Sequence, residues 1–287
     1  MKNRYELNGN RAKIYGEFIE PEQVFACGQC FRFVSQDGVY TGVAHGRVLH
    51  VRKIQEGVEI YPTTQQEMEE IWWHYFDLGF SYEEMMAQFD GDETIQASFA
   101  YAKGLRVLNQ PPFETIISFI ISANNNIKRI GGIIQRMCER WGRPIFFEGQ
   151  MYYDFPTAHI LGEQSEESLR EIGLGYRAPY IKKTCCAILD GFDLDAPYHL
   201  GYREAKEMLM ELSGVGPKVA DCILLFAYEK KSAFPRDVWI KRALKTFYGE
   251  EPKNDRELVQ LVNEKFGQYG GIVQQYLFQY ARLQKIV

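Results

Sequence analysis

The stretch Ser213-Gly214-Val215-Gly216-Pro217-Lys218 places two glycines and a proline between two amphipathic patterns. Residues 202–212 before it carry apolar side chains at helical spacing, and a second apolar face follows at Val219, Cys222, Ile223 and Phe226. Glycines one residue apart end a helix in a tight turn, while proline suits the first position of the next helix. The sequence therefore predicts a helix–hairpin–helix unit.

This hairpin suits a phosphate group. The backbone N–H groups of Gly214, Gly216 and Val219 lie beside the positive end of a helix and predict an anion site, although a simple helix cap followed by proline is the plainer alternative. Lys218 falls in the first turn of the second helix, where the dipole disfavours the ammonium form and a free amine can act as a nucleophile. Asp237 follows 19 residues later, where it can cap the next helix and can also serve catalysis.

This lysine and aspartate pattern resembles the helix–hairpin–helix DNA glycosylases, and it is similar to their 8-oxoguanine DNA glycosylase/lyase branch. The resemblance spans about Gly28 to Phe278 and implies an α+β fold acting on double-stranded DNA that contains oxidised guanine. It implies that the nucleotide flips out of the duplex and that Lys218 attacks C1′ of its sugar. A Schiff base and strand cleavage by β-elimination follow, while Asp237 stabilises the cationic sugar.

Four further residues match the family's contacts to the damaged base. The segment Gly28-Gln29-Cys30-Phe31-Arg32 matches a family pattern in which the glycine carbonyl meets the proton on N7 of 8-oxoguanine, a proton that guanine lacks. Gln274 matches a residue at the Watson–Crick edge of the base. Phe278 and Cys222 match residues that stack on its two faces. Core packing of a helix is the alternative for the last three.

A second set matches the family's contacts beside the vacated position. Asn124 matches an asparagine that fills the space left by the flipped base, and Arg129 matches an arginine that contacts the opposite cytosine. In the segment 173–177, Tyr176 corresponds to a wedge in the duplex and Arg177 to a second arginine on the same cytosine. The chain departs from the family at Trp239, where a histidine often contacts a phosphate, and at Cys30, where serine is more usual.

The patterns on either side of residue 67 differ in period. Alternating segments predict an antiparallel meander with strands at 11–18, 24–34, 40–44, 47–52 and 58–61. Helical spacing then predicts helices at 67–76, 82–88, 94–101, 113–122, 127–141, 165–172, 179–189, 202–212, 217–226, 238–248, 255–266 and 272–284. We expect residues 1–100 to form a β domain with flanking helices. Residues 101–287 are expected to form a helical region of two subdomains with the cleft between them.

Composition limits the partners and cofactors. The net charge of −5 requires local clusters of Lys and Arg to contact DNA, and the sequence offers several short ones. None of the six cysteines has the C-terminal spacing of an iron–sulfur cluster, and no side chains have metal-ligand spacing. The resemblance is compatible with a structural monovalent cation bound at the hairpin. Because residues 24–34 are predicted as a strand, Cys27 and Cys30 would be too far apart for a disulfide.

We expect a monomer without membrane contact, cytoplasmic and nucleoid-associated in a bacterium or nuclear in a eukaryote. Two alternatives remain. One is an alkylated-base glycosylase without lyase action, although that branch needs no lysine at position 218. The other is a DNA-binding module without excision, in which Lys218 and Asp237 would be surface charge and helix cap.

Overall fold

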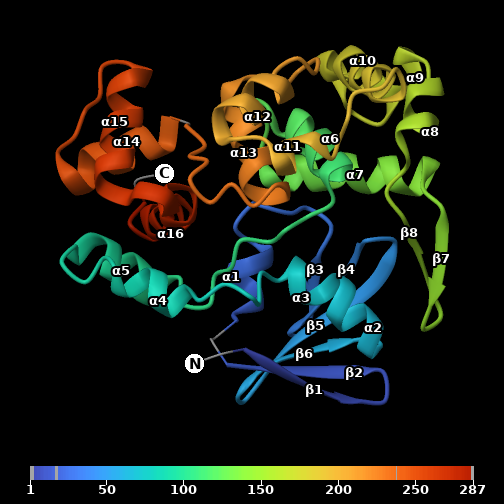
Figure 1. The fold of residues 1–287 in the computed structure, drawn as a ribbon. Helices are drawn as coiled ribbons and strands as arrows, with labels where there is room; N and C mark the ends of the chain where they lie inside the picture. The colour runs from blue at the N-terminus through green and yellow to red at the C-terminus, as the bar shows by residue number, and fades with distance from the viewer. Residues whose placement is uncertain (1–2, 17–18, 237, 286–287) are drawn as a thin grey trace.

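The computed structural model describes residues 3–16, 19–236 and 238–285. A β-sheet near the N-terminus, in blue, lies beside a larger helical part coloured from green to red (Figure 1). An antiparallel sheet followed by a mainly helical region confirms the predicted α+β class. None of the helices in the described parts of the chain has the length and hydropathy needed to cross a bilayer.

Six antiparallel strands form the N-terminal sheet, in the order β1-β2-β6-β5-β4-β3. The turns at Asp37-Gly38 and His45-Gly46 have positive φ at both residues, the hairpin geometry whose twist matches that of the flanking strands. The predicted meander is confirmed for β4 to β6, whereas β2 pairs with β6 and the strands β1 and β3 were not predicted. The strands are Arg4–Asn8 (β1), Arg11–Tyr15 (β2), Val34–Gln36 (β3), Val39–Ala44 (β4), Arg47–Ile54 (β5) and Gly57–Tyr61 (β6).

The strand predicted for residues 24–34 is wrong. Helix α1 occupies Pro21–Phe25, and the chain then bends repeatedly before β3. The apolar residues that suggested a strand instead pack on each other as the chain folds back: the rings of Phe25 and Phe33 stack with centroids 4.1 Å apart. Gly28 therefore lies in the turn between α1 and β3.

Helices dominate the rest of the chain and lie within a few residues of the predicted ranges. Two short helices, α8 and α11, and the hairpin of β7 (Pro144–Phe147) and β8 (Gln150–Tyr153) were not predicted. The helices are α2 (Gln65–Glu67), α3 (Trp73–Tyr75), α4 (Tyr82–Ala87), α5 (Glu93–Tyr101), α6 (Pro112–Ser122), α7 (Ile127–Trp141), α8 (Ala158–Glu163), α9 (Glu166–Glu171), α10 (Ala178–Leu189), α11 (Ala196–His199), α12 (Tyr202–Leu209), α13 (Pro217–Ala227), α14 (Val238–Tyr248), α15 (Asp255–Phe266) and α16 (Gly270–Leu283), with a π-helical turn at Met68–Trp72 between α2 and α3.

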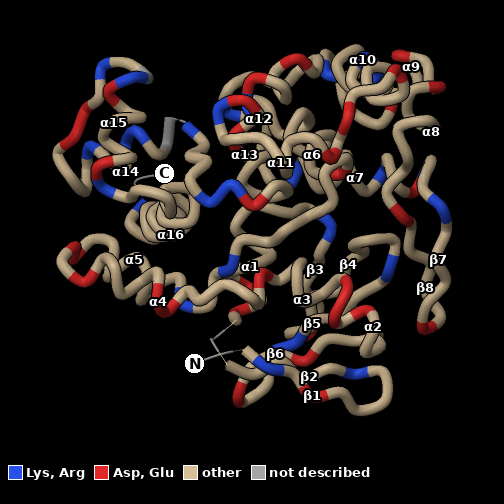
Figure 2. Tube along the Cα trace, in the orientation of Figure 1, with Lys and Arg blue, Asp and Glu red and all other residues tan. Residues whose placement is uncertain are grey.

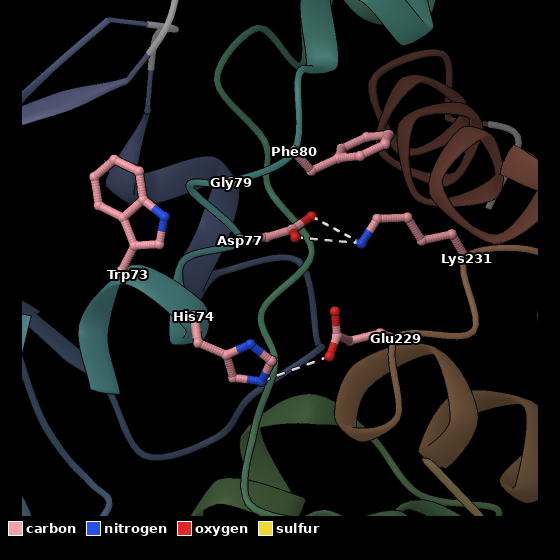
Figure 3. Close-up of a pocket in the computed structure, with 7 residues that line it drawn as sticks. All are labelled: Trp73, His74, Asp77, Gly79, Phe80, Glu229 and Lys231. Carbon is pink, nitrogen blue, oxygen red and sulfur yellow. Dashed lines mark hydrogen bonds and ion pairs between the residues drawn. The ribbon is translucent and has the colours of Figure 1, made fainter. Parts of the chain in front are cut away.

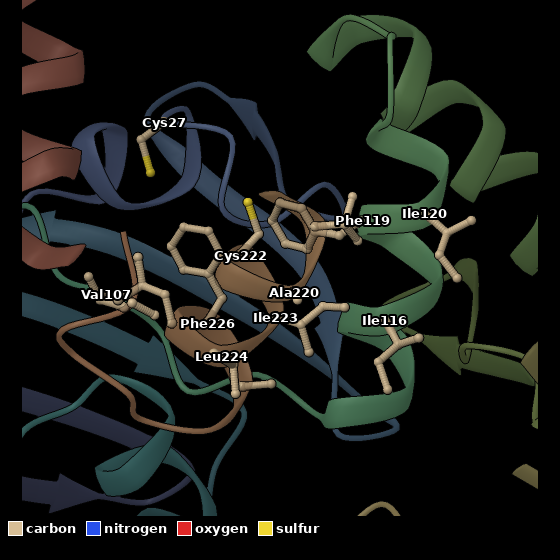
Figure 4. Packing of buried hydrophobic residues seen from close by; sticks show 14 of the residues in the cluster. Cys27, Val107, Ile116, Phe119, Ile120, Ala220, Cys222, Ile223, Leu224 and Phe226 are labelled. Atoms are coloured by element: carbon tan, nitrogen blue, oxygen red, sulfur yellow. The ribbon is translucent and has the colours of Figure 1, made fainter. Parts of the chain in front are cut away.

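Two hydrophobic cores hold these elements. The smaller one lies between the sheet, α1 and the helices that follow the sheet, and the larger one is built around α6 and α13. Every residue of α13 from Val219 onward is buried, and Phe119 of α6 stacks on Phe226 of α13 at 5.4 Å (Figure 4). A helix that is buried on all sides is a central helix, so α13 is enclosed by protein from Val219 to its end.

Candidate active site

The hairpin between α12 and α13 has the geometry that its glycines predict. Gly214 has φ +86°, and a Cβ atom there would lie 2.9 Å from Cβ of Tyr180 and 3.1 Å from Cγ2 of Ile120. Only glycine combines this conformation with such a close approach. Gly216 is the N-cap of α13, is exposed and has open space around its Cα. The helix–hairpin–helix prediction is confirmed.

The hairpin is held from outside by α10. The Thr184 hydroxyl donates a hydrogen bond of 2.8 Å to the Ser213 carbonyl. The first backbone N–H groups of a helix have no intrahelical acceptor, so the turn that contains Val219 can donate to an anion. A fixed hairpin with exposed Gly216 beside these groups is suited to one phosphate of a nucleic-acid backbone.

Lys218 is the second residue of α13 and is half-buried. No hydrogen bond or ion pair to its amine occurs within the described parts of the chain. Asp237 lies outside the described residues. In the sequence it directly follows Arg236 and precedes Val238, the first residue of α14.

Gly28 lies in the turn after α1 with φ +87°. A Cβ atom at this position would lie 3.1 Å from Cδ1 of Ile127, the first residue of α7. The structure thereby brings the Gly28 turn to the N-terminus of the helix that carries Arg129, although the two segments are about 100 residues apart in the sequence.

Gln29 holds this turn in place and was not predicted as a site residue. Its side-chain amide donates to the carbonyls of Val24 and Arg106 at 2.9 and 2.7 Å and accepts from the Leu108 N–H at 2.8 Å. Its backbone carbonyl accepts from the Gln110 side chain at 2.7 Å. A buried glutamine with these four bonds fixes the peptide next to Gly28. Only its place in the glycine-glutamine pattern could have indicated the role.

Helix α16 carries Gln274 and Phe278 one turn apart, on the same face. Gln274 is 3% exposed and accepts from the Gln275 side chain, whereas Phe278 is half-buried. The end of α16 reaches the α1 segment: Arg282 donates to the Ala26 carbonyl at 3.4 Å. The helix therefore lies beside the chain that leads into the Gly28 turn.

Cys222 lies one turn after Lys218 on α13 and is 3% exposed. It belongs to the same hydrophobic cluster as Cys27, two residues after α1 (Figure 4). Both thiols of the Cys27-Cys30 pair are free, and burial raises the pKa of Cys27 to about 11 and that of Cys30 well above its usual range. Protonated thiols are poor nucleophiles and metal ligands, which argues against redox chemistry here.

The residues matched to the opposite strand form a second group. Tyr176 donates from its hydroxyl to the Ala123 carbonyl at 3.2 Å, and Arg177 donates to the carbonyls of Ala123 and Asn124 at 3.1 and 3.0 Å. The Arg177 guanidinium lies 4.4 Å from the centre of the Tyr176 ring. Asn124 is exposed with φ +49°, and Arg129 is exposed in the first turn of α7. The structure thus brings three of these four residues into direct contact.

Lys, Arg, Asp and Glu are spread over both parts of the molecule (Figure 2). Two cavities are lined by none of the residues predicted for the site, although the second includes Ile127 and Lys128, which precede Arg129. One of about 470 Å³ joins the segment after α3 to the segment after α13, and its charged groups pair with each other: Lys231 with Asp77 at 3.1 Å and His74 with Glu229 at 3.8 Å (Figure 3). The other, about 920 Å³, lies between the sheet, α7 and the β7–β8 hairpin. Among the described residues, no group of His, Cys, Asp or Glu is arranged to bind a metal ion.

The chain is similar to known proteins over nearly its whole length. Residues 13–116 match the family described as 8-oxoguanine DNA glycosylase, N-terminal domain, and residues 117–268 match the HhH-GPD superfamily base excision DNA repair proteins. A probable N-glycosylase/DNA lyase of Methanothermobacter thermautotrophicus is 35% identical over 252 residues, which cover 81% of this chain and 80% of that protein. The N-glycosylase/DNA lyase of Saccharomyces cerevisiae is 38% identical over 171 residues, 54% of this chain and 46% of that protein.

One solved structure is similar to this chain over almost the whole length of both. The 8-oxoguanine glycosylase/lyase of Clostridium acetobutylicum, crystallised with double-stranded DNA containing cytosine opposite 8-oxoguanine, is 38% identical. The two folds superpose with a TM-score of 0.94 over 98% of each chain. The similarity therefore includes the sheet as well as the helical part.

Proposed function

The chain belongs to the HhH-GPD superfamily of base excision DNA repair proteins, as an N-glycosylase/DNA lyase of its 8-oxoguanine branch, and from that premise we propose how its residues excise the damaged base. Lys218 is the nucleophile. The observation that carries this assignment is a half-buried amine without a partner among the described residues, at the positive end of α13 and directly after the hairpin. An amine at this position can act as a nucleophile toward a sugar whose phosphate the hairpin holds.

The hairpin positions the sugar. The amides around Gly216 and Val219 hold one backbone phosphate, and the damaged nucleotide is turned out of the duplex because its C1′ atom is otherwise inaccessible. The free amine of Lys218 bonds to C1′, and the C1′–N9 electron pair leaves with the base, which takes up a proton. The attacking amine gives up a proton, and the resulting hemiaminal ether opens by cleavage of the C1′–O4′ bond, with O4′ taking up a proton, to a protonated Schiff base. Loss of a C2′ proton then breaks the C3′–O3′ bond and expels the 3′ phosphate. The Asp237 carboxylate stabilises the cationic sugar.

The base and its former partner are recognised on separate sides. The Gly28 carbonyl accepts from N7–H of 8-oxoguanine, Gln274 meets its Watson–Crick edge, and Phe278 and Cys222 stack on its faces. On the other side, Arg129 and Arg177 donate to O2 and N3 of the opposite cytosine. These two contacts favour lesions paired with cytosine. Tyr176 wedges the duplex, and Asn124 fills the position that the flipped base has vacated.

A monovalent cation fits the turn after α12. Within the described parts of the chain, the Leu212 carbonyl accepts one hydrogen bond, from the Val215 N–H at 3.1 Å, and a carbonyl oxygen has two lone pairs. The carbonyls at the end of α12 also carry the negative end of its dipole. Backbone oxygens of this turn would hold such a cation, which would supply positive charge near the phosphate.

Borohydride trapping on a duplex with one 8-oxoguanine tests the proposal. The wild-type protein should become covalently linked to the DNA, whereas Lys218→Gln should lose the link entirely because no Schiff base forms. Lys183→Gln, which removes an exposed lysine of α10, is the matched control and should trap like the wild type. Trapping of Lys218→Gln at the wild-type level would remove Lys218 from this role. Binding without excision by the wild type would indicate the DNA-binding module.

A further inference from the structure

A single arginine of α7 holds the start of the segment that carries Tyr176 and Arg177. Nε of Arg136 donates a hydrogen bond of 2.9 Å to the carbonyl of Ile172, the C-cap residue of α9. The last carbonyls of a helix have no intrahelical donor, and a bond from a charged guanidinium is stronger than one between neutral groups. The segment 173–177, here called the wedge loop, begins directly after this carbonyl.

Two glycines make room for this arginine. Gly132 lies one turn earlier on α7, and a Cβ atom there would lie 3.4 Å from Nη1 of Arg136. Gly173, the first residue of the wedge loop, has φ +98°, and a Cβ atom there would lie 3.0 Å from Nη2 of Arg136 and 3.5 Å from Cγ1 of Ile133. The guanidinium therefore lies between the helix and the loop, and the absence of both Cβ atoms lets it pack closely against each.

The other end of the wedge loop is bonded to the segment that leads into α7. Its side chains Tyr176 and Arg177 donate to the carbonyls of Ala123 and Asn124. Under the proposed function, these bonds are exchanged when the two side chains meet DNA. The hydrogen bond from Arg136 needs no such exchange, because neither of its partners is a group that the proposed function brings to DNA. It can therefore hold the loop on α7 while the other end changes its contacts.

We propose that Arg136 is a positioning residue for recognition of the opposite strand: it holds the wedge loop at a fixed place on α7, in register with Arg129 of the same helix. The inference rests on the contacts proposed for Arg129, Tyr176 and Arg177. Seven residues, or about two turns of α7, separate the two arginines of this helix. Arg136 is not a catalytic residue, because its effect passes through the Ile172 carbonyl.

Excision of 8-oxoguanine opposite each of the four bases, at single turnover with enzyme in excess, tests this role. Arg136→Met keeps a flexible, unbranched side chain and removes the donors. Excision opposite cytosine should slow about tenfold and excision opposite the other three bases at most about threefold, because a displaced Arg177 loses a contact that only cytosine provides. The preference for cytosine should therefore fall about threefold or more. A merely structural loss would slow excision equally opposite all four bases.

Arg140→Met is the matched control. Arg140 lies one turn further along α7, is also exposed, and donates at 2.8 Å to the Glu171 side chain of α9. Its loss removes the same charge and a bond to the same helix, while Arg136 still holds the Ile172 carbonyl. The excision rate and the cytosine preference of this variant should stay within about twofold of wild type, because exposed ion pairs contribute little.

Gly173→Ala tests the same contact from the side of the loop. Alanine is strained at φ +98° and its Cβ atom would meet Nη2 of Arg136, so the cytosine preference should again fall about threefold or more. Gly191→Ala is the matched control, with φ +108° and open space around it, and it should keep the preference of wild type. If Gly173→Ala does not fold, the two arginine variants carry the test.

Three results overturn the inference: a wild-type preference for cytosine in Arg136→Met, equal slowing opposite all four bases in that variant, or an equal loss of preference in Arg140→Met. Weaker binding of Arg136→Met to undamaged duplex with the preference retained belongs to the first result, and would mean that Arg136 contacts DNA itself. A wild-type protein without preference for cytosine, or an Arg177→Ala variant that keeps it, would instead contradict the proposed function, so the two failures are distinguishable.

Discussion

The two sides of the candidate site are built differently. On the side of the base, the Gly28 turn is fixed by four hydrogen bonds of Gln29, and Gln274 is buried. On the side of the opposite strand, Tyr176 is 54% exposed and Asn124 and Arg129 are exposed. The Arg177 guanidinium there donates to carbonyls of the protein's own chain.

This difference indicates two modes of recognition. A contact that must distinguish 8-oxoguanine from guanine by one proton requires an acceptor that cannot move aside, and an internally bonded turn provides it. In the proposed function, contacts to the opposite strand form once the base is turned out of the duplex. Arg177 is 3% exposed and would exchange its bonds to the Ala123 and Asn124 carbonyls for bonds to DNA, so adaptation on this side depends on the exposed residues Tyr176, Asn124 and Arg129. The following predictions test this contrast, from the largest effect to the smallest.

Gln29→Leu should have the largest effect. It leaves the Leu108 N–H and the Arg106 carbonyl buried without their partner, so the free energy of unfolding should fall by about 3–5 kcal/mol in urea titrations. The control Gln135→Leu removes one exposed bond on α7 and should change the stability by less than about 0.5 kcal/mol. A loss below about 1 kcal/mol for Gln29→Leu would contradict a rigid Gly28 turn.

Gly28→Ala should have an intermediate effect. Alanine at φ +87° is strained and its Cβ atom meets Ile127, so the loss of stability should be about 1–2 kcal/mol and excision of 8-oxoguanine should slow about tenfold or more. Gly38→Ala is the matched control, with φ +78° and open space around it. It should lose about 1 kcal/mol in stability and keep full activity. Equal activity of the two variants would show that the Gly28 turn does not contact the base.

Arg129→Ala should leave stability within about 0.5 kcal/mol, because the side chain is exposed. When excision is measured opposite each of the four bases, the preference for cytosine should fall about tenfold, since a matched arginine contact discriminates between bases by about 1–3 kcal/mol. Lys128→Ala removes the neighbouring exposed cation and should weaken binding equally for all four bases. An unchanged preference in Arg129→Ala would place cytosine recognition elsewhere.

The wrong strand prediction for residues 24–34 shows when an apolar pattern fails to predict the backbone conformation. Alternating apolar residues normally indicate a strand, but here they fill the space between a short helix and the sheet, as the stacked rings of Phe25 and Phe33 show. The periodicity reports only that side chains are buried. The partners that bury them decide the backbone conformation.

By itself the sequence determined most of the helices from residue 65 onward and the hairpin at Gly214, because helical periodicity and the stereochemistry of glycine and proline act over a few residues. It also placed Lys218 in the first turn of a helix. It did not determine the short elements α8, α11 and the β7–β8 hairpin. Only the tertiary structure decided that Gly28 lies against α7, that Gln29 bonds to Arg106 and Leu108, and that Asp221 faces Arg236. Each of these contacts joins residues 15 to about 100 positions apart, and no local pattern specifies which distant group will neutralise a buried charge or satisfy a buried amide.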